Sequence, residues 1–383
     1  MIYLDSAATT AIRREVLEAM WPHLTAEFGN PSSHNELGTS AAGALADARA
    51  RAAVIFGCRS SEVVFTSGGT EGANLAVTGI ALAHPRGRHI VTSAIEHPAV
   101  LESCDYLERF HGFEITRLAV DRDGLVGLDD LAAALRPDST LVSVMYANNE
   151  IGTVQPIAAI ARATHAVGAA MHTDAVQAPG SLRLNVRGLG VDALSISGHK
   201  FGAPKGVRAM FLASGTPIEP LIHGGGQERG RRSGTVNVAG AFGLAIALEL
   251  ADQSRAANAA RLSEARDVFI RDILASVPSA RLTGSTLSRL PGSASFTFAG
   301  TSGESIVLEL ELERRGVVCS SGSACAAGSD EPSGVLLALG ITAELAQTAV
   351  RFSFGEDIGP AELAVVTREL QCAVATIGSG RTN

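Results

Sequence analysis

The sequence predicts an α/β protein, with a mainly parallel sheet flanked by helices and a smaller α/β second domain. The first observation behind this prediction is the regular exchange of strand-like and helix-like segments from residue 62 onward. The second is the length of 383 residues, which is more than one small hydrophobic core requires. The third is an apolar content of 46% beside 18% charged residues, which is typical of an ordinary globular chain.

The first half of the chain supplies most of the predicted sheet. Amphipathic helices are expected over residues 13–21 and 40–56. The strand Val63–Thr66 then ends in Ser67-Gly68-Gly69-Thr70, and Glu71 opens a helix. Further strands are predicted at 89–93, 114–119, 140–146, 169–173 and 193–197, with helices at 98–109, 128–135 and 157–167. Strands separated by helices run parallel, whereas Val207–Leu212 follows too soon for a helix and indicates a local antiparallel hairpin.

The second half predicts another α/β unit after one long helix. This helix covers about 236–275 and stops before Pro278. Strands near 293–298, 317–319 and 349–354 follow, with helices near 303–314, 334–339 and 360–376. We therefore expect a large domain of residues 13–250. The small domain would contain residues 1–12 and 251–383, with a mobile loop at about 319–334.

Charge and cysteine usage narrow the function classes. The net charge of −8 argues against a nucleic-acid-binding surface. No run of about 18 apolar residues predicts a membrane span, and the first residues lack the pattern of a signal peptide. The five cysteines are scattered and odd in number, which indicates a reducing cytoplasm rather than a disulfide framework.

The residues that can carry chemistry follow the predicted strands of the first domain. They are Thr70, His97, Asn149, Asp174, Gln177 and the segment Ser197–Lys200. In open parallel sheets, ligands bind at the carboxyl edge of the strands. We therefore expect these side chains to meet in one site.

Two of these segments suggest a phosphate and a reactive amine. Ser67-Gly68-Gly69-Thr70-Glu71-Gly72 joins a strand to a helix and is either an anion site or only a tight turn. Lys200 directly follows a buried strand, so its amine is predicted to point into the crevice, where desolvation would favour Schiff-base chemistry. The alternative is a surface lysine beyond the end of a strand.

Three further residues also have alternative interpretations. Asp174 suits a pyridinium nitrogen or a helix N-cap. His97 could stack on a flat ring and move protons, or it could be an ordinary loop histidine. Arg351 lies between apolar strand neighbours and would bind either a carboxylate ligand or an internal acid. A metal site of His97, His172, Asp174 and His199 is the weaker alternative, because no close-spaced ligand pair supports it.

Cys325 closes the run Cys319-Ser320-Ser321-Gly322-Ser323-Ala324-Cys325 and is followed by further small residues. Such a thiol is predicted to lie on a mobile loop, as either a nucleophile or an incidental cysteine. The loop from Gly224 to Thr235, rich in glycine and arginine, could approach a phosphate or a partner subunit.

Together these motifs resemble the cysteine desulfurases, pyridoxal-phosphate enzymes of the class V aminotransferase group. The resemblance runs almost end to end. It rests on Tyr3–Thr10, Phe28–Ser33, Glu96–Val100, Asn148–Gly152, Ser197–Lys200, Ser320–Cys325 and Arg351–Ser353. It implies the pyridoxal-phosphate-dependent transferase fold, with a sheet of the seven-stranded type.

The resemblance also implies a role for each site residue. Lys200 would hold pyridoxal 5′-phosphate, with Asp174 at the ring nitrogen and Gln177 at the ring hydroxyl. His97 would stack on the ring and assist proton transfer. The phosphate would lie against Gly69, Thr70, Ser197 and His199, with Thr235 coming from the second subunit of a homodimer. Asn149 and Arg351 would bind the carboxylate of L-cysteine, and Asn149 also the cofactor. Cys325 would be the nucleophile that receives the sulfur as a persulfide.

The resemblance further implies release of L-alanine and transfer of the sulfur to an acceptor protein. The acceptor would serve iron–sulfur cluster assembly or another thiolation pathway, such as tRNA thiolation or DNA sulfur modification. One departure is His34, which comes one position early, so that Asn35 takes the usual histidine place. Rival functions are other chemistry on the same fold, such as selenocysteine lyase, kynureninase-like or aminotransferase activity, and a non-catalytic sulfur carrier.

Overall fold

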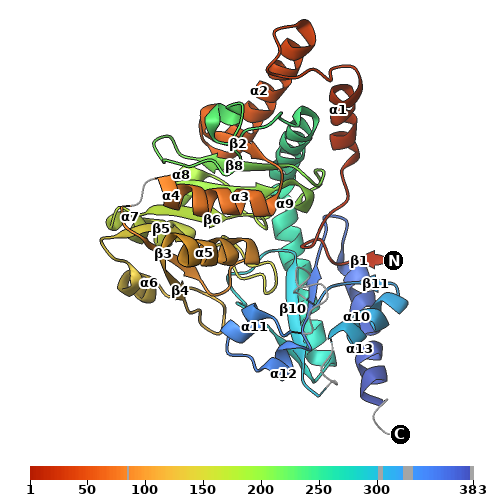
Figure 1. Ribbon diagram of the computed structural model, residues 1–383. Helices are drawn as coiled ribbons and strands as arrows, with labels where there is room; N and C mark the ends of the chain where they lie inside the picture. The colour runs from red at the N-terminus through yellow and green to blue at the C-terminus, as the bar shows by residue number, and fades with distance from the viewer. Residues whose placement is uncertain (84–85, 301–304, 322–330, 380–383) are drawn as a thin grey trace.

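The computed structural model describes residues 1–83, 86–300, 305–321 and 331–379. Its centre is a seven-stranded sheet of order β2-β8-β7-β6-β5-β3-β4 (Figure 1). Strands β3 to β7 run parallel to one another, whereas β8 is antiparallel to both β2 and β7. The predicted fold class and the predicted hairpin are confirmed. The strands are β2 (Val63–Thr66), β3 (His89–Ser93), β4 (Glu114–Leu118), β5 (Ser139–Ser143), β6 (Ala170–Asp174), β7 (Ala193–Ser197) and β8 (Arg208–Leu212).

Helices cover both faces of this sheet. The helices of the described residues, including those of the C-terminal part, are α1 (Arg14–Thr25), α2 (Glu36–Phe56), α3 (Gly69–Asn74), α4 (Ile80–Ala83), α5 (Pro98–His111), α6 (Leu128–Ala134), α7 (Ile157–Ala166), α8 (Val186–Leu189), α9 (Val238–Ser276), α10 (Ser305–Arg314), α11 (Gly334–Ala338), α12 (Ala343–Ala346) and α13 (Pro360–Ser379). The short π-helix η2 (Leu75–Gly79) joins α3 to α4. No helix in the described ranges is both long enough and apolar enough to cross a membrane.

The strands are apolar because they are buried on both sides. Ile90, Leu141 and Ala193 belong to a core with residues of α3 and α5. Their chain neighbours Val91, Val142 and Leu194 belong to a second core with residues of α1, α2, α7 and α9. Successive strand side chains point to opposite faces, so consecutive apolar residues are needed to fill both layers.

Helix α2 begins at Glu36, four residues before its predicted start, because Asn35 caps it. The Oδ1 atom of Asn35 accepts a hydrogen bond from the backbone N–H of Gly38 at 2.8 Å. This contact satisfies one of the free N–H groups of the first turn. His34, whose position departs from the family pattern, is exposed. Asn35, which stands where the family usually has histidine, therefore has a structural role.

Helix α9, 39 residues long, belongs to both hydrophobic cores. Its residues up to Ala251 pack in the core behind the large sheet, and those from Leu262 onward pack in the core of the small sheet. Figure 1 shows it running from the large sheet down to the C-terminal elements. The separate cores support the predicted domains, 13–250 and 1–12 with 251–383, and this division stays a prediction.

The small domain holds a three-stranded antiparallel sheet of order β12-β10-β9. Its strands are β9 (Ala280–Leu282), β10 (Ser293–Phe298) and β12 (Val350–Ser353), and β1 (Ile2–Tyr3) pairs in parallel with β11 (Val317–Val318). The buried side chain of Leu4 joins this core. The sequence did not predict β1 or β9, because two or three residues carry too little periodicity.

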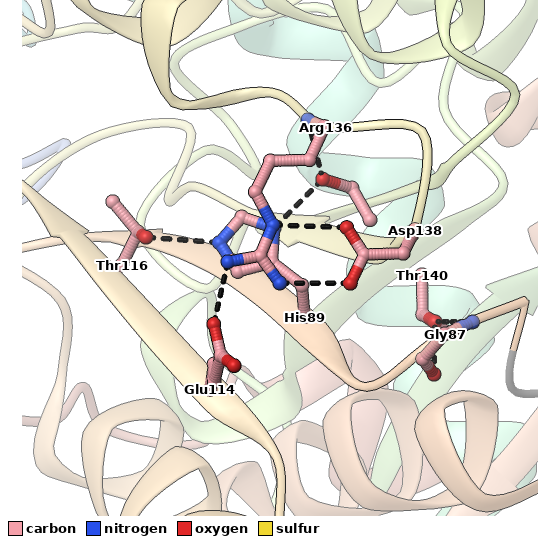
Figure 2. Close-up of polar contacts among 8 residues, drawn as sticks. Gly87, His89, Glu114, Thr116, Arg136, Asp138 and Thr140 are labelled. Atoms are coloured by element: carbon pink, nitrogen blue, oxygen red, sulfur yellow. Dashed lines mark hydrogen bonds and ion pairs between the residues drawn. The ribbon is translucent and has the colours of Figure 1, made fainter.

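A polar cluster ties β3, β4 and β5 together at their amino ends (Figure 2). The buried ring of His89 contacts Ser139 Oγ at 2.7 Å and Thr116 Oγ1 at 2.9 Å. Arg136 forms ion pairs with Glu114 and Asp138. Burial, together with the charge of Arg136, lowers the pKa of His89, so the ring is neutral and shares hydrogen bonds rather than charge. The polar side chains at this edge of the sheet therefore contact one another and hold the three strands together.

His172 is a second buried histidine, in the middle of β6. Its ring lies between Ser143 Oγ at 2.9 Å and Ser195 Oγ at 3.1 Å. Burial lowers the pKa of His172 to about 4, an effect that Arg208 strengthens and Asp174 opposes. The ordinary histidine pKa is about 6.5, so the folded state binds fewer protons than the unfolded state between these values. The stability due to this neutral ring is complete above about pH 6.5 and is lost as the pH falls towards 4.

We predict that His172→Gln flattens the acid dependence of stability. Between pH 7 and pH 5 the wild type should lose about 2 kcal/mol through this group, which a glutamine cannot lose. Urea unfolding of both proteins at the two pH values measures the difference. A lower stability of the variant at pH 7 does not affect this comparison, which concerns the change between the two pH values. An equal loss in both proteins would show that His172 does not cause the acid sensitivity.

Candidate active site

A cavity of about 360 Å³ opens at the carboxyl edge of the large sheet. Its wall contains every predicted site residue except Thr235 and Cys325, namely Gly69, Thr70, His97, Asn149, Asp174, Gln177, Ser197, His199, Lys200 and Arg351. Arg351 comes from β12 of the small domain, and the others come from the ends of the large-domain strands and the segments that follow. The sheet topology thus brings these residues together from positions far apart in the sequence.

Lys200 reaches this wall from the short turn η3 (Gly198–Lys200) after β7. Its Nζ donates hydrogen bonds to the carbonyl oxygens of Ala7 at 2.5 Å and Ala8 at 2.9 Å. Both alanines also line the cavity. The amine therefore lies at the cavity wall and not on the outer surface, which was the alternative interpretation of this lysine.

The N-terminal segment closes the site from the small-domain side. Gln177 Nε2 donates to Ala7 O at 3.1 Å, and Thr10 Oγ1 donates to His199 O at 3.0 Å. The ring of His199 contacts Thr9 Oγ1 at 3.2 Å. Sequence reasoning gave Ala7 and Ala8 no function, because their contribution is made by backbone carbonyls. The one signal was the presence of Tyr3–Thr10 among the family motifs.

Asp174 ends β6 and is buried at the cavity wall. Its Oδ1 accepts a hydrogen bond from the backbone N–H of Val176 at 2.9 Å. Arg208 Nη2 lies 3.8 Å from the same oxygen. The carboxylate thus orders the turn after β6, as a capping residue does, and also faces the site.

His97 is the N-cap of α5, and its Nδ1 accepts from the backbone N–H of Ala99 at 3.0 Å. In the neutral ring the proton is therefore on Nε2. The preceding residue, Glu96, is buried, and burial raises its pKa to about 8, although hydrogen bonds from Ser93 Oγ and Met145 N oppose the rise. Sequence reasoning missed Glu96, since its burial depends on the packing of β5.

The glycine-rich loop after β2 is held by a chain of charged contacts. Glu71 accepts hydrogen bonds from the backbone N–H and the hydroxyl of Ser67. Arg232 pairs with the same carboxylate at 2.8 Å.

The ring of His199 is neutral at pH 7. Burial, with the neighbouring Lys200, Lys205 and Arg208, lowers the pKa of His199 to about 4. Gly69 and Thr70 line the cavity beside Ser197.

Arg351 is buried and has protein partners as well as a place at the cavity wall. Its Nη2 lies 2.6 Å from Asp5 Oδ1, and its Nη1 donates to the carbonyl oxygen of Asn149 at 2.9 Å. The internal ion pair, one of the two alternatives for this residue, is present. The two partners fix the plane of the guanidinium group at the wall.

Thr235 and Cys325 are not placed at this cavity. Thr235 is exposed at the end of the loop from Gly224. That loop is anchored by Glu228, which is buried and forms two hydrogen bonds with Arg49 at 2.7 and 2.6 Å. Cys325 lies outside the described residues. The cysteines within them, Cys58, Cys104, Cys319 and Cys372, are free thiols.

The metal alternative finds no cluster in the described part of the chain, where no three His, Cys, Asp or Glu side chains gather as ligands would. His172, one of the residues considered for it, uses both ring nitrogens on the hydroxyls of Ser143 and Ser195.

Comparisons with known proteins agree with the architecture of the site. The aminotransferase class V family matches residues 2–364. A cysteine desulfurase IscS of Dictyoglomus turgidum is 50% identical over 92% of this chain and 89% of its own. A solved NifS-like protein is 34% identical with a TM-score of 0.91, covering 98% of this chain and 99% of its own. The solved structure of SspA in complex with cysteine is 34% identical with a TM-score of 0.80, covering 92% and 99% of the two chains.

The family match spans nearly the whole chain, and the similarity to the named desulfurase extends over 355 residues. The chain therefore belongs to the class V aminotransferase family and, within it, to the cysteine desulfurases, which are pyridoxal-phosphate-dependent enzymes.

Proposed function

We propose that the chain converts L-cysteine to L-alanine in this cavity and passes the sulfur to Cys325 as a persulfide, from which an acceptor protein takes it. The observation that carries the proposal is the convergence of Lys200, Asp174 and His97 on one cavity at the carboxyl edge of the sheet. The similarity to proteins named cysteine desulfurases supports the choice of substrate.

The residues of the cavity fit pyridoxal 5′-phosphate. Its volume of about 360 Å³ lies within the range of small-molecule sites. Lys200 would hold the aldehyde, Asp174 would pair with the ring nitrogen, and Gln177 would bond the ring hydroxyl. Gly69, Thr70, Ser197 and His199 would bind the phosphate. When bound, the cofactor supplies an electron sink that allows the Cα proton of the amino acid to be removed.

Lys200 and His97 are the groups placed to move protons. The carbonyl oxygens of Ala7 and Ala8 hold the lysine amine at the wall. The Ala99 amide fixes the imidazole of His97 with its Nε2 proton-bearing. Asn149 and Arg351 would orient the substrate carboxylate, because Arg351 presents a fixed guanidinium plane there.

Cys325 would complete the reaction as a thiolate. Its sulfur would attack the substrate sulfur, so that an S–S bond forms while the Cβ–Sγ bond of the substrate breaks. The electron pair of the broken bond stays with the carbon, which takes up a proton to become the methyl group of alanine. The predicted mobility of the loop at about 319–334 would then carry the persulfide to an acceptor.

Replacing Cys325 tests this assignment. We expect Cys325→Ala to abolish sulfide release from L-cysteine while the cofactor absorbance persists, because the nucleophile is lost and the cofactor site is not. Cys372→Ala, at an exposed thiol on α13, is the matched control and should retain full activity. Full desulfurase activity in Cys325→Ala would show that another group accepts the sulfur.

We propose further that two copies of the chain share each site, with Thr235 reaching the phosphate of the partner subunit. Two observations support this. Thr235 is exposed in its own subunit. Its loop is rigidly anchored, since Glu228 and Arg229 keep positive φ angles of 49° and 59°. Non-glycine residues adopt this conformation only where surrounding contacts hold them, here the buried Arg49–Glu228 pair.

Mixed dimers distinguish a site that is shared between two subunits from a site that is formed within one subunit. Lys200→Ala and Thr235→Ala are each expected to impair activity severely. When the two variants are mixed and allowed to exchange subunits, we expect activity from about a quarter of the sites, because each mixed dimer regains one intact site. Turnover of L-cysteine by the mixture measures this recovery. If Thr235 served its own subunit, mixing would restore nothing.

The acceptor would act in iron–sulfur cluster assembly or another thiolation pathway, and we propose the cytoplasm as the place of action. Incubation with sulfur-labelled cysteine and candidate acceptor proteins, followed by detection of the label, distinguishes these pathways. Selenocysteine as a competing substrate separates the desulfurase from a selenocysteine lyase, since a lyase would turn it over when Cys325 is replaced.

A further inference from the structure

Arg208 is a cationic residue of this region to which sequence reasoning gave no role. It begins β8 and has 0% of its side chain exposed. Because β8 runs antiparallel between β2 and β7, Arg208 is paired with Thr66 on one side and Ser197 on the other. These two residues precede the glycine-rich loop and Lys200, so Arg208 lies at the cavity edge of the sheet.

The guanidinium group of Arg208 has few partners. Its Nη1 donates to the carbonyl oxygen of Gly68 at 3.3 Å, and its Nη2 lies 3.8 Å from Asp174 Oδ1, beyond hydrogen-bond distance. Neither Nε nor Nη2 has a hydrogen-bond partner among the described residues. A buried cation with unsatisfied donors is costly, so the arrangement indicates an anion that completes it.

Gly72 gives this guanidinium group its space, and Gly69 lies within contact distance of it. A Cβ atom at Gly72 would stand 2.8 Å from Arg208 Nε, a clash. A Cβ atom at Gly69 would stand 3.5 Å from Arg208 Nη1 and 3.9 Å from Ser197 Oγ. The backbone of α3 therefore lies directly against Arg208. Gly69, Ser197 and Asp174, which surround the group, all form part of the cavity wall.

None of the described residues proposed above to bind the phosphate carries a positive charge. Thr70 and Ser197 contribute neutral hydroxyls, and His199 is neutral because its pKa is lowered to about 4. Arg232 is paired with Glu71. Burial lowers the pKa of Arg208 to about 10, against the attraction of Asp174 and Glu71, so its side chain stays charged at pH 7.

We propose that Arg208 is a positioning residue for the cofactor phosphate, supplying a fixed positive charge from behind the glycine-rich loop and Ser197. The inference rests on the proposed function, because the anion is the phosphate of pyridoxal 5′-phosphate. Through Nη1 and the Gly68 carbonyl, Arg208 also fixes the loop in the conformation that meets the phosphate. Its charge would then act on both the phosphate and Asp174, whose Oδ1 lies 3.8 Å from Nη2.

A comparison of two ligands tests the proposal. Full-length protein stripped of cofactor is titrated with pyridoxal 5′-phosphate and with pyridoxal, which lacks the phosphate, and binding is followed by absorbance. We expect Arg208→Met to weaken binding of the phosphorylated ligand by about tenfold to a hundredfold. Binding of pyridoxal should change by less than about twofold. Arg208→Lys should restore part of the loss, because it keeps the charge.

Controls separate this effect from a loss of structure. Arg266→Met removes another buried arginine, which binds Asp267 and the Leu290 carbonyl, and should leave the ratio of the two affinities unchanged. If Arg208→Met does not fold, Gly72→Ala serves instead, since its methyl group displaces the guanidinium and should weaken the phosphorylated ligand selectively. In the Arg208→Met background, Gly72→Ala should add no further loss.

The proposal would be overturned if Arg208→Met weakened the binding of both ligands equally or changed the binding of neither. Arg208 would then act only through the fold or through Asp174. For Gly72→Ala the same two outcomes would overturn it. Failure of the proposed function looks different. In that case the wild-type protein itself would bind pyridoxal 5′-phosphate no better than pyridoxal and would show no cofactor absorbance.

Discussion

The hydrogen bonds from Lys200 Nζ to the carbonyl oxygens of Ala7 and Ala8 are the contact on which the site depends. The lysine belongs to the large sheet, whereas the N-terminal segment is built into the small domain through Leu4 and the pairing of β1 with β11. The same segment carries Asp5, the ion-pair partner of Arg351. One short stretch of chain therefore sets the position of the amine and of the guanidinium group at once.

The acceptors of these two hydrogen bonds from Lys200 are neutral. A hydrogen bond to a neutral carbonyl oxygen contributes less to stability than one to a charged group. Two ion pairs lie in the same region, one between Arg351 and Asp5 and the other between Glu71 and Arg232. The site thus combines neutral contacts with charged ones.

The sequence predicted the parts of the site that depend on strand ends. Lys200 and His97 follow strands of the parallel sheet and Asp174 ends one, and parallel strands end at one edge. It could not choose between the two interpretations of Asp174 or of Arg351, and in the structure both residues line the cavity while keeping an internal partner. A carboxylate has two oxygens and a guanidinium group five N–H donors, so one side chain can serve both.

Other parts could not be predicted, for physical reasons that differ. Ala7 and Ala8 act through backbone atoms, which any residue has. Arg208 comes into the site only through the antiparallel register of β8 between β2 and β7. The burial of Glu96 depends on packing against β5, and the strands β1 and β9 are too short to show a period. Thr235 is exposed in the single chain, so the role proposed for it depends on a second copy of the chain.

Helix α9 has a mechanical consequence. At about 1.5 Å per residue its 39 residues extend for roughly 60 Å, and each end is embedded in a different core. Ala251 is the last of its residues buried in the first core, and Leu262 is the first buried in the second. The helix is therefore one continuous element whose two ends are packed into different cores. A bend of α9 that moved one core relative to the other would fall on the span between Ala251 and Leu262, where no residue of the helix is buried.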